Sequence, residues 1–458
     1  MEVADVERIH EASLSLLADP GVRIEHDGVY ERLLKAGARP GTDAQVVRFP
    51  RQLVTECVEG APEEAHFADR RGGEHVVGRE RPSRVWSIPA LNVLRHGEHR
   101  RFTSSDMADV ARLVDRLENV DAVFGLSLDD VPPGARDVVG LRVCAQNTTK
   151  HIRVLCFTPE GADVLCEMQQ ALGGKPWFSV GFTAHGPLRW TRLALEIFAR
   201  TAGHGIPVTV NGEPTAGASS PVTLAGAAAV GNAEILAGIA LNQVLEPGRP
   251  CVHNLGLAHF LDMRTAIAVT GAPENNLFAA MCADLGRFYR LPSCSWVSTE
   301  SMCVDTQAAM EKTFGFQAQL AAGVSLVWGV GQLESELTFS PAQAVIDNEI
   351  LSCCKRYFRG VEVSDETLAV DVARRVGIAG GFLDDEHTLR HFRDELWEPS
   401  ILWRNRRELW NERGAPRLEE TAEARADKLI AEKAEPCLTE DQEKELLAIE
   451  SDYLKRMG

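Results

Sequence analysis

Aromatic side chains lie near the ends of the β-rich runs of this chain and acidic ones lie nearby, and together they could recognise an organic cation. Ring faces attract a quaternary ammonium group, which has no N–H to donate in a hydrogen bond. Nearby carboxylates would balance its charge. Buried rings at strand ends are also ordinary core residues, so each ring has that second interpretation. The aromatic residues are Trp86, Phe182, Trp296 and Trp328, and the acidic ones are Glu213, Glu300, Glu334 and Glu336.

Polar side chains that could orient the rest of a ligand follow the same runs. His185 comes after the run 177–182, and Asn211 follows the run 206–210. We expect both to bind substrate, together with the four aromatic side chains and Glu336. Neighbouring carboxylates can act as general acid and base. The expected catalytic carboxylates are Glu213, Glu300 and Glu334.

Motifs of several familiar chemistries are absent from the sequence. It contains no HExxH, no paired CxxC and no His/Cys cluster at ligand spacing, so we expect no tightly bound metal. It also contains no Walker motif, no GxGxxG after a strand and no GxSxG elbow, which argues against common nucleotide sites and serine hydrolases. An enzyme built from this chain would act through binding and electrostatics, or with a cofactor carried by a partner.

Short β-rich runs would position these side chains. Roughly 25 to 45 residues with helical spacing separate consecutive runs, which favours an α/β fold of the (β/α)8 or TIM barrel type, although doubly wound folds alternate similarly. In a barrel, the residues after each strand face one common site. The runs span 84–88, 122–126, 152–157, 177–182, 206–210, 250–254, 293–297 and 324–330. We expect a helical N-terminal cap over 1–80, the barrel over 81–380 and a charged helical C-terminal extension over 381–458.

The stretch 206–243 contains one complete strand-loop-helix unit. A loop of small residues after the strand carries Glu213, and a helix rich in Ala and Gly follows. Ser220 as N-cap and Pro221 at the first helical position predict where this helix begins. Its small residues predict close packing against a sheet.

The composition limits the classes of partner. The chain has 458 residues and a formal charge of −18, and it shows no cluster of Lys and Arg that would bind nucleic acid or an anionic membrane. Its eleven cysteines are scattered and lie mostly within apolar runs, which is typical of reduced thiols. We expect a cytoplasmic protein without a membrane span.

Several short motifs follow one another along the chain in a specific order and spacing, although each motif is weak alone. They are LLADPGVRI near the start, DVPPGARD (130–137), QNTTKH (146–151), AGASSPVTLAG (216–226), NAEILAG (232–238), DMRT (262–265) with GAPENN, GQLESELTFS (331–340), IDNEI (346–350) and DELWEP (394–399). Together they resemble the trimethylamine methyltransferase (MttB) superfamily, in its members without pyrrolysine, such as glycine betaine:corrinoid methyltransferases. The resemblance extends to about Trp397.

The resemblance implies a TIM barrel that transfers a methyl group from a quaternary, betaine-like amine to the Co(I) of a corrinoid (cobalamin) carried by a separate cognate protein. It also implies a homo-oligomer. A quaternary nitrogen already carries the charge that makes a tertiary amine a leaving group, so no acid has to protonate it. A dry aromatic pocket would supply orientation and desolvation. Trp296 and Trp328 are the expected cage, with Phe182 and Trp86 behind them.

Two positions depart from the family pattern. Trp328 stands where many relatives have an NLIH-type strand end, and Glu336 stands where they usually have a smaller residue. Glycine betaine is therefore one candidate substrate beside carnitine-like, proline-betaine-like and choline-like molecules. A substrate carboxylate would need a cation or amide donors. The candidates are Asn211, Asn92 and Arg264, of which Arg264 is expected to be structural.

Two other functions stay open at this point. A barrel hydrolase or lyase could use Glu213 and Glu300 as acid and base without a partner protein. A non-catalytic relative of the methyltransferases could bind ligands, with the charged tail as its interaction element. Methylation of a Co(I) corrinoid by a quaternary amine would separate the methyltransferase hypothesis from both.

Overall fold

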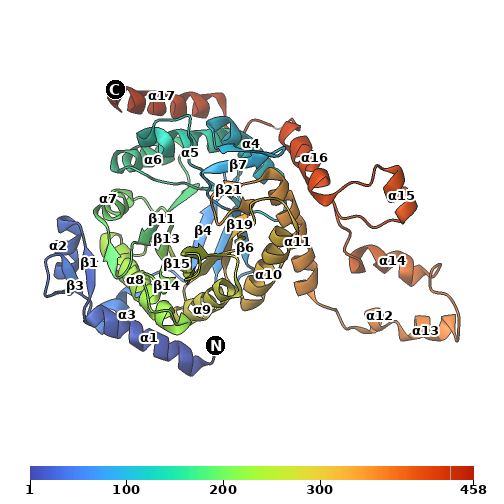
Figure 1. Ribbon diagram of the computed structural model, residues 1–458, viewed down its shortest axis with the longest axis horizontal. Coiled ribbons are helices and arrows are strands. Elements are labelled where there is room, and N and C mark those ends of the chain that lie inside the picture. The colour runs from blue at the N-terminus through green and yellow to red at the C-terminus, as the bar shows by residue number, and fades with distance from the viewer. Residues whose placement is uncertain (434, 458) are drawn as a thin grey trace.

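The computed structural model describes residues 1–433 and 435–457, and within them eight parallel strands form a closed barrel (Figure 1). Each strand overlaps one of the runs predicted from the sequence, so the predicted barrel is confirmed. Around the barrel the order is β10, β11, β13, β15, β18, β19, β6, β9. The strands are β6 (Arg84–Ser87), β9 (Ala122–Phe124), β10 (His151–Arg153), β11 (Phe178–Ala184), β13 (Val208–Gly212), β15 (Cys251–Gly256), β18 (Ser293–Trp296) and β19 (Leu326–Val330).

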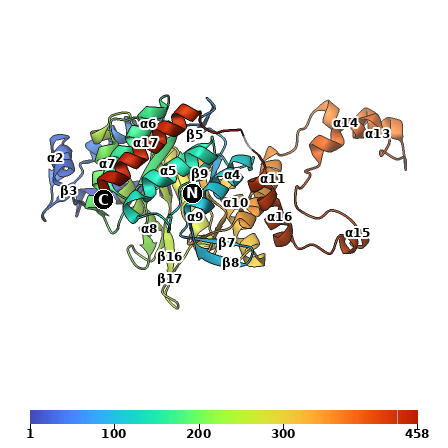
Figure 2. The ribbon, with the colours of Figure 1, turned by 90° about the horizontal axis from the view of Figure 1, so that it is seen from above.

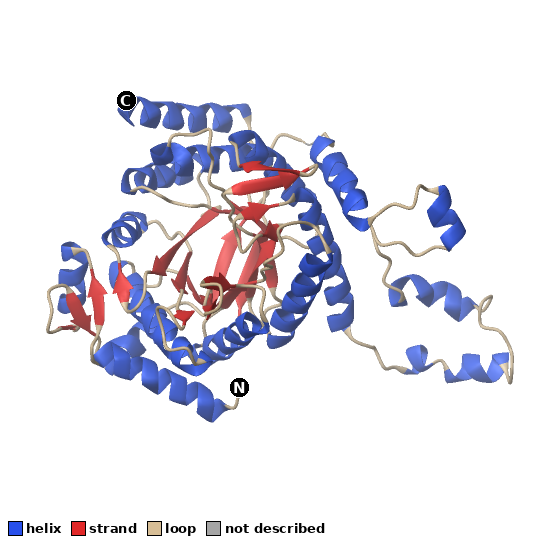
Figure 3. Cartoon of the chain, in the orientation of Figure 1, coloured by secondary structure: helices blue, strands red, loops and turns tan. Residues whose placement is uncertain are grey.

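Helices surround the barrel on the outside (Figure 3). Apolar residues at helical spacing give these segments one face that packs against the strands. The helices are α4 (Ser104–Arg116), α5 (Arg136–Asn147) after the short turn η1 (Pro133–Ala135), α6 (Pro159–Leu172), α7 (Arg192–Thr201), α8 (Leu224–Leu245), α9 (Pro273–Tyr289), α10 (Thr306–Ala322) and α11 (Pro341–Arg359).

Helix α8 is the Ala- and Gly-rich helix predicted after the loop of small residues. It begins at Leu224 with Thr223 as N-cap, so the predicted start at Ser220 and Pro221 is wrong. Ser220 instead forms a β-bridge with Ala216, which extends the loop past the proline. The helix is long and apolar enough to cross a membrane, yet 83% of its most apolar window is buried against the barrel and the N-terminal helices. It is a core helix.

The N-terminal region packs its helices against α8 on the outside of the barrel and places the hairpin β4–β5 at the bottom, where the barrel strands begin. It combines three helices with five strands, so the predicted cap is a mixed α/β region rather than a helical one. The hairpin β4–β5 inserts Phe67 between the rings of Trp86 and His151, with centroids 4.9 and 5.0 Å away. The elements are α1 (Val3–Ala18), β1 (Val22–Ile24), α2 (Asp27–Lys35), β2 (Arg39–Pro40), β3 (Val46–Arg48), α3 (Arg51–Glu59), β4 (Glu64–Ala68) and β5 (Glu74–Gly78).

Besides the hairpin β4–β5, three smaller sheets flank the barrel in the described chain, and two of them lie at its mouth, the end at which the barrel strands finish. One of these joins β14 to the hairpin β16–β17, and the other joins β20–β21 to β7–β8. Both project from the same side of the barrel (Figure 2). The third pairs β12 (Arg189–Trp190) with β1. The mouth strands are β14 (Thr215–Ala216), β16 (His259–Asp262), β17 (Ile267–Val269), β20 (Gln332–Leu333), β21 (Thr338–Phe339), β7 (Asn92–Arg95) and β8 (Glu98–Arg101).

After α11 the chain forms an arm, residues 360–416, that projects away from the barrel before returning to it (Figures 1 and 2). None of the residues of α12–α15, all of them described, is buried. The extension thus leaves the barrel near 360 rather than at 381. The capping box of Thr439 and Gln442 is confirmed. The helices are α12 (Asp365–Leu368), α13 (Val370–Val376), α14 (Glu386–Glu395), α15 (Arg407–Glu412), α16 (Leu418–Ala431) and α17 (Glu440–Met457).

Candidate active site

Trp296 and Trp328 lie side by side inside the barrel, in register on β18 and β19. Their exposed fractions are 2% and 3%. The edge of Phe124 on β9 approaches the Trp328 ring, with centroids 5.0 Å apart. Within the described chain neither indole N–H has a hydrogen-bond partner. A buried donor without an acceptor is unfavourable, so each of these N–H groups would gain from an added acceptor.

Trp86 lies beneath Trp328, nearer the bottom of the barrel. The two rings stack with centroids 6.4 Å apart. Trp86 is fully buried, and its Nε1 donates to Nε2 of His75 at 3.0 Å. Burial lowers the pKa of His75 to about 3 and that of His151 well below its ordinary value, so both imidazoles stay neutral. Trp86 therefore supports Trp328 from below.

Phe182 and His185 are not brought to the barrel interior. Phe182 stacks on Phe198 of α7 with centroids 4.1 Å apart, so it faces the helical layer. His185 is exposed, and its Nδ1 lies 3.1 Å from the carbonyl oxygen of Thr183. The inward positions of β11 are Gly181 and Thr183.

Asn211 belongs to a buried amide network at the mouth ends of three strands. Its Nδ2 donates to Oγ1 of Thr183 at 3.1 Å, and its Oδ1 accepts from Nδ2 of Asn254 at 2.9 Å. Asn254 in turn accepts from the backbone N–H of Gly256. The network holds the amides rigidly against the barrel interior.

Glu213 sits at the mouth next to the aromatic pair. Its Oε1 lies 3.2 Å from Nε2 of His259, whose ring centroid is 5.5 Å from that of Trp296. The Glu213 side chain is 42% exposed. It therefore offers a hydrated carboxylate close to the buried rings.

Glu300 has its carboxylate committed to the backbone. Its Oε1 accepts from the backbone N–H of Gly271 at 2.7 Å and from Oγ1 of Thr270 at 2.9 Å. These contacts tie the loop after β18 to the end of β17. The arrangement suits a loop anchor better than a mobile general acid or base.

Glu334, Ser335 and Glu336 form a left-handed turn, with φ values of 54°, 50° and 78°. Residues other than glycine rarely adopt this backbone conformation, which costs about 1 kcal/mol or more per residue. Backbone bonds to the loop after β18 hold the turn, from Glu334 to Ser301 and from Ser335 to Thr299, both at 2.9 Å. Glu334 also accepts from Oγ1 of Thr338.

Glu336 is the third residue of this strained turn, which follows the mouth end of β19. Burial, together with the negative charge of Glu213, raises its pKa to about 8. Glu213 and Glu336 thus form an acidic pair near the mouth, in which the raised pKa keeps Glu336 protonated at neutral pH. A cation entering the mouth would favour the ionised form of Glu336.

A buried ion pair fixes the backbone that follows Trp328. The ammonium of Lys312 lies 3.1 Å from Oδ2 of Asp347, and both side chains are fully buried. Lys312 also donates to the carbonyl oxygen of Gly329, and Asp347 accepts from the backbone N–H of Gly331 at 2.8 Å. The pair positions both Trp328 and the left-handed turn.

Arg153 on β10 is a functional candidate that the sequence reasoning missed. It is 5% exposed inside the barrel, with its guanidinium carbon 5.2 Å from the Phe124 ring centroid and 6.0 Å from that of Trp328. Its position in the apolar run after Ile152 was the available signal, because an arginine inside such a run has to be buried. The other candidates for an anion partner are occupied: Arg264 pairs with Asp262 at 2.7 Å, and Asn92 donates to Leu337.

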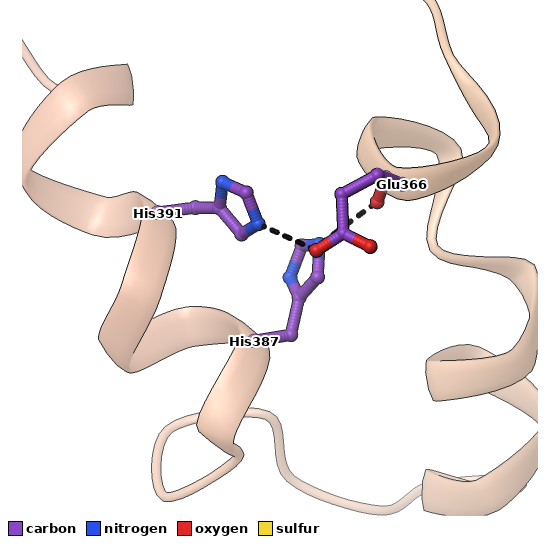
Figure 4. A group of neighbouring side chains, drawn as sticks. All are labelled: Glu366, His387 and His391. Carbon is purple, nitrogen blue, oxygen red and sulfur yellow. Dashed lines mark hydrogen bonds and ion pairs between the residues drawn. The ribbon is translucent and has the colours of Figure 1, made fainter.

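In the described part of the chain, one group of side chains has metal-ligand geometry, and it lies in the arm (Figure 4). His391 contacts the carboxylate of Glu366 at 3.1 Å, and His387 contacts the backbone oxygen of Glu366 at 3.1 Å. Arg390 pairs with the same carboxylate at 3.1 Å. Because the carboxylate already has a cationic partner, we assign no metal to this group.

The fold and this site define a (β/α)8-barrel protein whose mouth combines buried indoles with carboxylates. A family model described as trimethylamine methyltransferase (MTTB) matches residues 1–457. The chain belongs to this methyltransferase family, as its motifs predicted.

Relatives with printed functions span most of the chain. A trimethylamine methyltransferase MttB of Desulfitobacterium hafniense is 32% identical over 89% of this chain and 84% of its own length. A glycine betaine methyltransferase of the same species is 27% identical over 99% of this chain and 96% of its own length. The crystal structure of the Methanosarcina barkeri monomethylamine methyltransferase (MtmB) has a TM-score of 0.53 at 13% identity, covering 93% of this chain and 86% of that one. The last likeness concerns the fold alone.

Proposed function

We propose that this protein transfers a methyl group from a quaternary, betaine-like amine to the Co(I) of a corrinoid carried by a cognate protein. The observation that carries the proposal is the pair Trp296 and Trp328, two buried indoles side by side below the acidic pair Glu213 and Glu336. Such a combination suits a cation that cannot donate hydrogen bonds. The names of the relatives, which include a glycine betaine methyltransferase, support the same substrate class.

The chain's own part in this reaction is to bind and orient the substrate. The corrinoid supplies the nucleophile when its carrier protein is docked. Trp328 and Trp296 remove water from the ammonium group and hold one methyl toward the mouth, which provides orientation and desolvation. Because the leaving amine departs neutral, no proton transfer is required. Glu213 and Glu336 therefore act as countercharges.

An apolar rim around the mouth supports docking of a partner there. Exposed hydrophobic side chains are normally scattered singly over a protein surface. Here several large ones lie on the loops that follow the barrel strands. We define the rim as Leu91 (41% exposed), Val222 (53%), Met263 (72%), Ile267 (55%), Met302 (66%) and Leu337 (44%). A protein that covers this rim would place its cofactor over Trp296 and Trp328.

The arm supports the proposal of a homo-oligomer in the cytoplasm. It exposes apolar side chains in the segments that flank its short helices, including Val361 (85%), Ile378 (105%) and Leu383 (87%). A second copy of the chain is the partner that is always present to cover them. All eleven cysteines, which lie within the described residues, are free thiols, as a reducing compartment would maintain.

The test is methyl transfer followed by visible spectroscopy. Purified protein is mixed with free Co(I) cobalamin or a Co(I) corrinoid protein and then with glycine betaine, carnitine, choline, tetramethylammonium or trimethylamine. We expect conversion of the Co(I) spectrum to the methylated form with a quaternary amine. Conversion with trimethylamine alone, or with no panel member in the presence of a competent control methyltransferase, would overturn the proposal.

A further inference from the structure

Arg153 carries a positive charge inside the barrel without a countercharge. Its Nη1 donates to the carbonyl oxygen of Val154 at 2.6 Å, and its Nη2 donates to Oγ1 of Thr209 at 3.4 Å. Among the described residues its Nε has no hydrogen-bond partner, and no carboxylate lies within 4.0 Å of its nitrogen atoms. Burial lowers the pKa of Arg153 to about 9, so the group remains charged at neutral pH.

Arg249 shows how this fold neutralises a buried arginine elsewhere. It is 1% exposed, yet Glu246 lies 3.5 Å from its Nε. Nε also donates to the carbonyl oxygen of Ile206 at 2.8 Å, and Nη2 donates to Oγ1 of Thr201 at 3.1 Å. A buried ion without a partner is among the most costly placements of a side chain. The contrast indicates that the partner of Arg153 comes from outside the chain.

The surroundings of Arg153 define the chemistry of that partner. The unpaired polar atoms of Arg153, Trp296 and Trp328 are all N–H donors: Nε and the two Nε1 atoms. Gly181 leaves room for the guanidinium, since a Cβ there would lie 1.9 Å from Nη2 of Arg153. A site of donors around a fixed cation requires an acceptor that carries negative charge, and a carboxylate matches the planar guanidinium.

We infer that Arg153 binds the carboxylate of the substrate and makes the protein selective for quaternary amines that bear one. This inference rests on the proposed function and narrows its substrate class to zwitterions. Arg153 ends β10, but it pairs with Ser179 near the start of β11, and its guanidinium reaches Thr209, which precedes Glu213 by four residues. Its charge therefore lies deeper in the barrel than the carboxylates of Glu213 and Glu336, which follow the strand ends. A zwitterion aligned with this charge order places its ammonium group, and the methyl to be transferred, toward the mouth. A choline-like substrate would leave Arg153 without a partner.

The test measures binding of two ligands that separate the charges, by isothermal titration. One is 3,3-dimethylbutanoate, which has the shape of glycine betaine and its carboxylate but no positive charge. The other is tetramethylammonium, which has only the cation. In R153Q we expect roughly 10- to 100-fold weaker binding of 3,3-dimethylbutanoate, because a charge-assisted, bidentate contact is lost. Tetramethylammonium should bind as well as before or more tightly, since a repelling charge is removed.

The unfolding temperature provides a second measurement. Removal of an arginine with only a structural role would lower it, whereas removal of Arg153 should not. R153M should unfold at the same temperature as the wild type or higher, because an uncompensated buried charge is removed. R249M, the matched control, should unfold at a lower temperature, because the substitution removes the cationic partner of Glu246 and the hydrogen bonds to Ile206 and Thr201. R153K retains the charge and should keep part of the carboxylate preference.

The outcomes separate this inference from the proposed function. The inference is overturned if folded R153Q loses binding of both ligands equally, or if its preference between the two ligands is unchanged. This holds even if quaternary amines methylate Co(I). Weaker binding of 3,3-dimethylbutanoate alone supports the inference about Arg153. If in addition no amine of the panel methylates Co(I), the proposed function fails and the inference about Arg153 stands. Equal reaction of choline and glycine betaine in the wild type would also overturn it.

Discussion

Glu336 combines a conformation that favours glycine with a carboxyl group whose pKa is raised to about 8. The folded protein holds this proton up to about pH 8, whereas an ordinary glutamate loses it near 4.5. Between these values the folded state binds more protons, so the contribution of Glu336 to the free energy of unfolding falls as pH rises. The strained backbone of the turn lowers the free energy of unfolding further. A residue kept at such a position is typical of a functional site.

The pH dependence of cation binding is therefore a prediction about this residue. Tetramethylammonium should bind the wild type more tightly as pH rises through about 8, because Glu336 becomes a second countercharge beside Glu213. E336Q keeps the shape of the side chain but cannot ionise. Its affinity for tetramethylammonium should therefore stay constant between roughly pH 6.5 and pH 9, a range that includes the pKa of Glu336. Titration calorimetry at each pH measures this. If E336Q shows the same pH dependence as the wild type, another group causes the effect. The control is E362Q, which removes an exposed glutamate in the arm and should leave the pH dependence unchanged.

Trp328 can be tested as a cation-binding ring by W328L. Loss of the ring face should weaken tetramethylammonium binding roughly 2- to 30-fold, the range of cation–π contributions. W177L is the matched control. Trp177 is 2% exposed, against 3% for Trp328, and its N–H is likewise unpaired among the described residues, but it precedes β11 at the opposite end of the barrel. Both variants should lose some stability. Equal affinity in W328L and the wild type would make Trp328 a core residue only.

Phe182 shows why the inward face of a barrel strand is hard to predict from sequence. Strands buried on both faces carry apolar side chains at every position, so their composition does not reveal which ones point inward. Phe182 was expected at the pocket but faces α7, whereas Gly181 next to it faces Arg153. Trp296, Trp328 and Asn211 were placed correctly at inward positions near the mouth. Whether they bind substrate stays a prediction.

At the scale of elements, a buried ion pair connects α10, α11 and the end of β19. K312M should lower the free energy of unfolding by about 3 to 5 kcal/mol, because it leaves the carboxylate of Asp347 buried and unpaired. Denaturant unfolding measures the loss. K455M, which breaks an exposed pair with Asp452 at 3.2 Å, should have little effect.

The double variant K312M/D347L distinguishes two explanations of that loss. If the cost comes from the stranded charge, replacing both partners restores much of the stability. If the double variant is as unstable as the single one, the contacts of the pair with Gly329 and Gly331 provide the stabilisation instead. Full stability of K312M would contradict both explanations.

Element boundaries were predictable to different degrees for physical reasons. The capping box of Thr439 and Gln442 is a local interaction, and it forms as predicted at the start of α17. Ser220 and Pro221 offered an equally clear local signal, but the bridge of Ser220 to Ala216 competes with helix formation and delays α8 to Leu224. Tertiary pairing overrides local preference there.

At the scale of the whole molecule, the barrel was predictable because its alternation of strand and helix repeats along the chain. The arm was not, since its charged and apolar residues resemble an ordinary surface helix pattern in sequence. The structure shows that α12–α15, which lie wholly within the described chain, bury none of their residues. An isolated chain would gain little from ordering helices this short, because helices below about 12 residues are marginal without packing.

The arm therefore predicts that the protein exists as an assembly of identical chains. I378D/L383D introduces charge where side chains are 105% and 87% exposed, so the fold of a single chain has no reason to change. In the assembly the same positions would be buried, and an unpaired carboxylate there is unfavourable. We expect the wild type to have the mass of an oligomer by light scattering, and the variant to dissociate with an unchanged circular dichroism spectrum. V3D, at a residue that is 71% exposed on α1, should keep the wild-type mass. A monomeric wild type, or a variant that retains the wild-type mass, would mean that the arm is not the contact between copies.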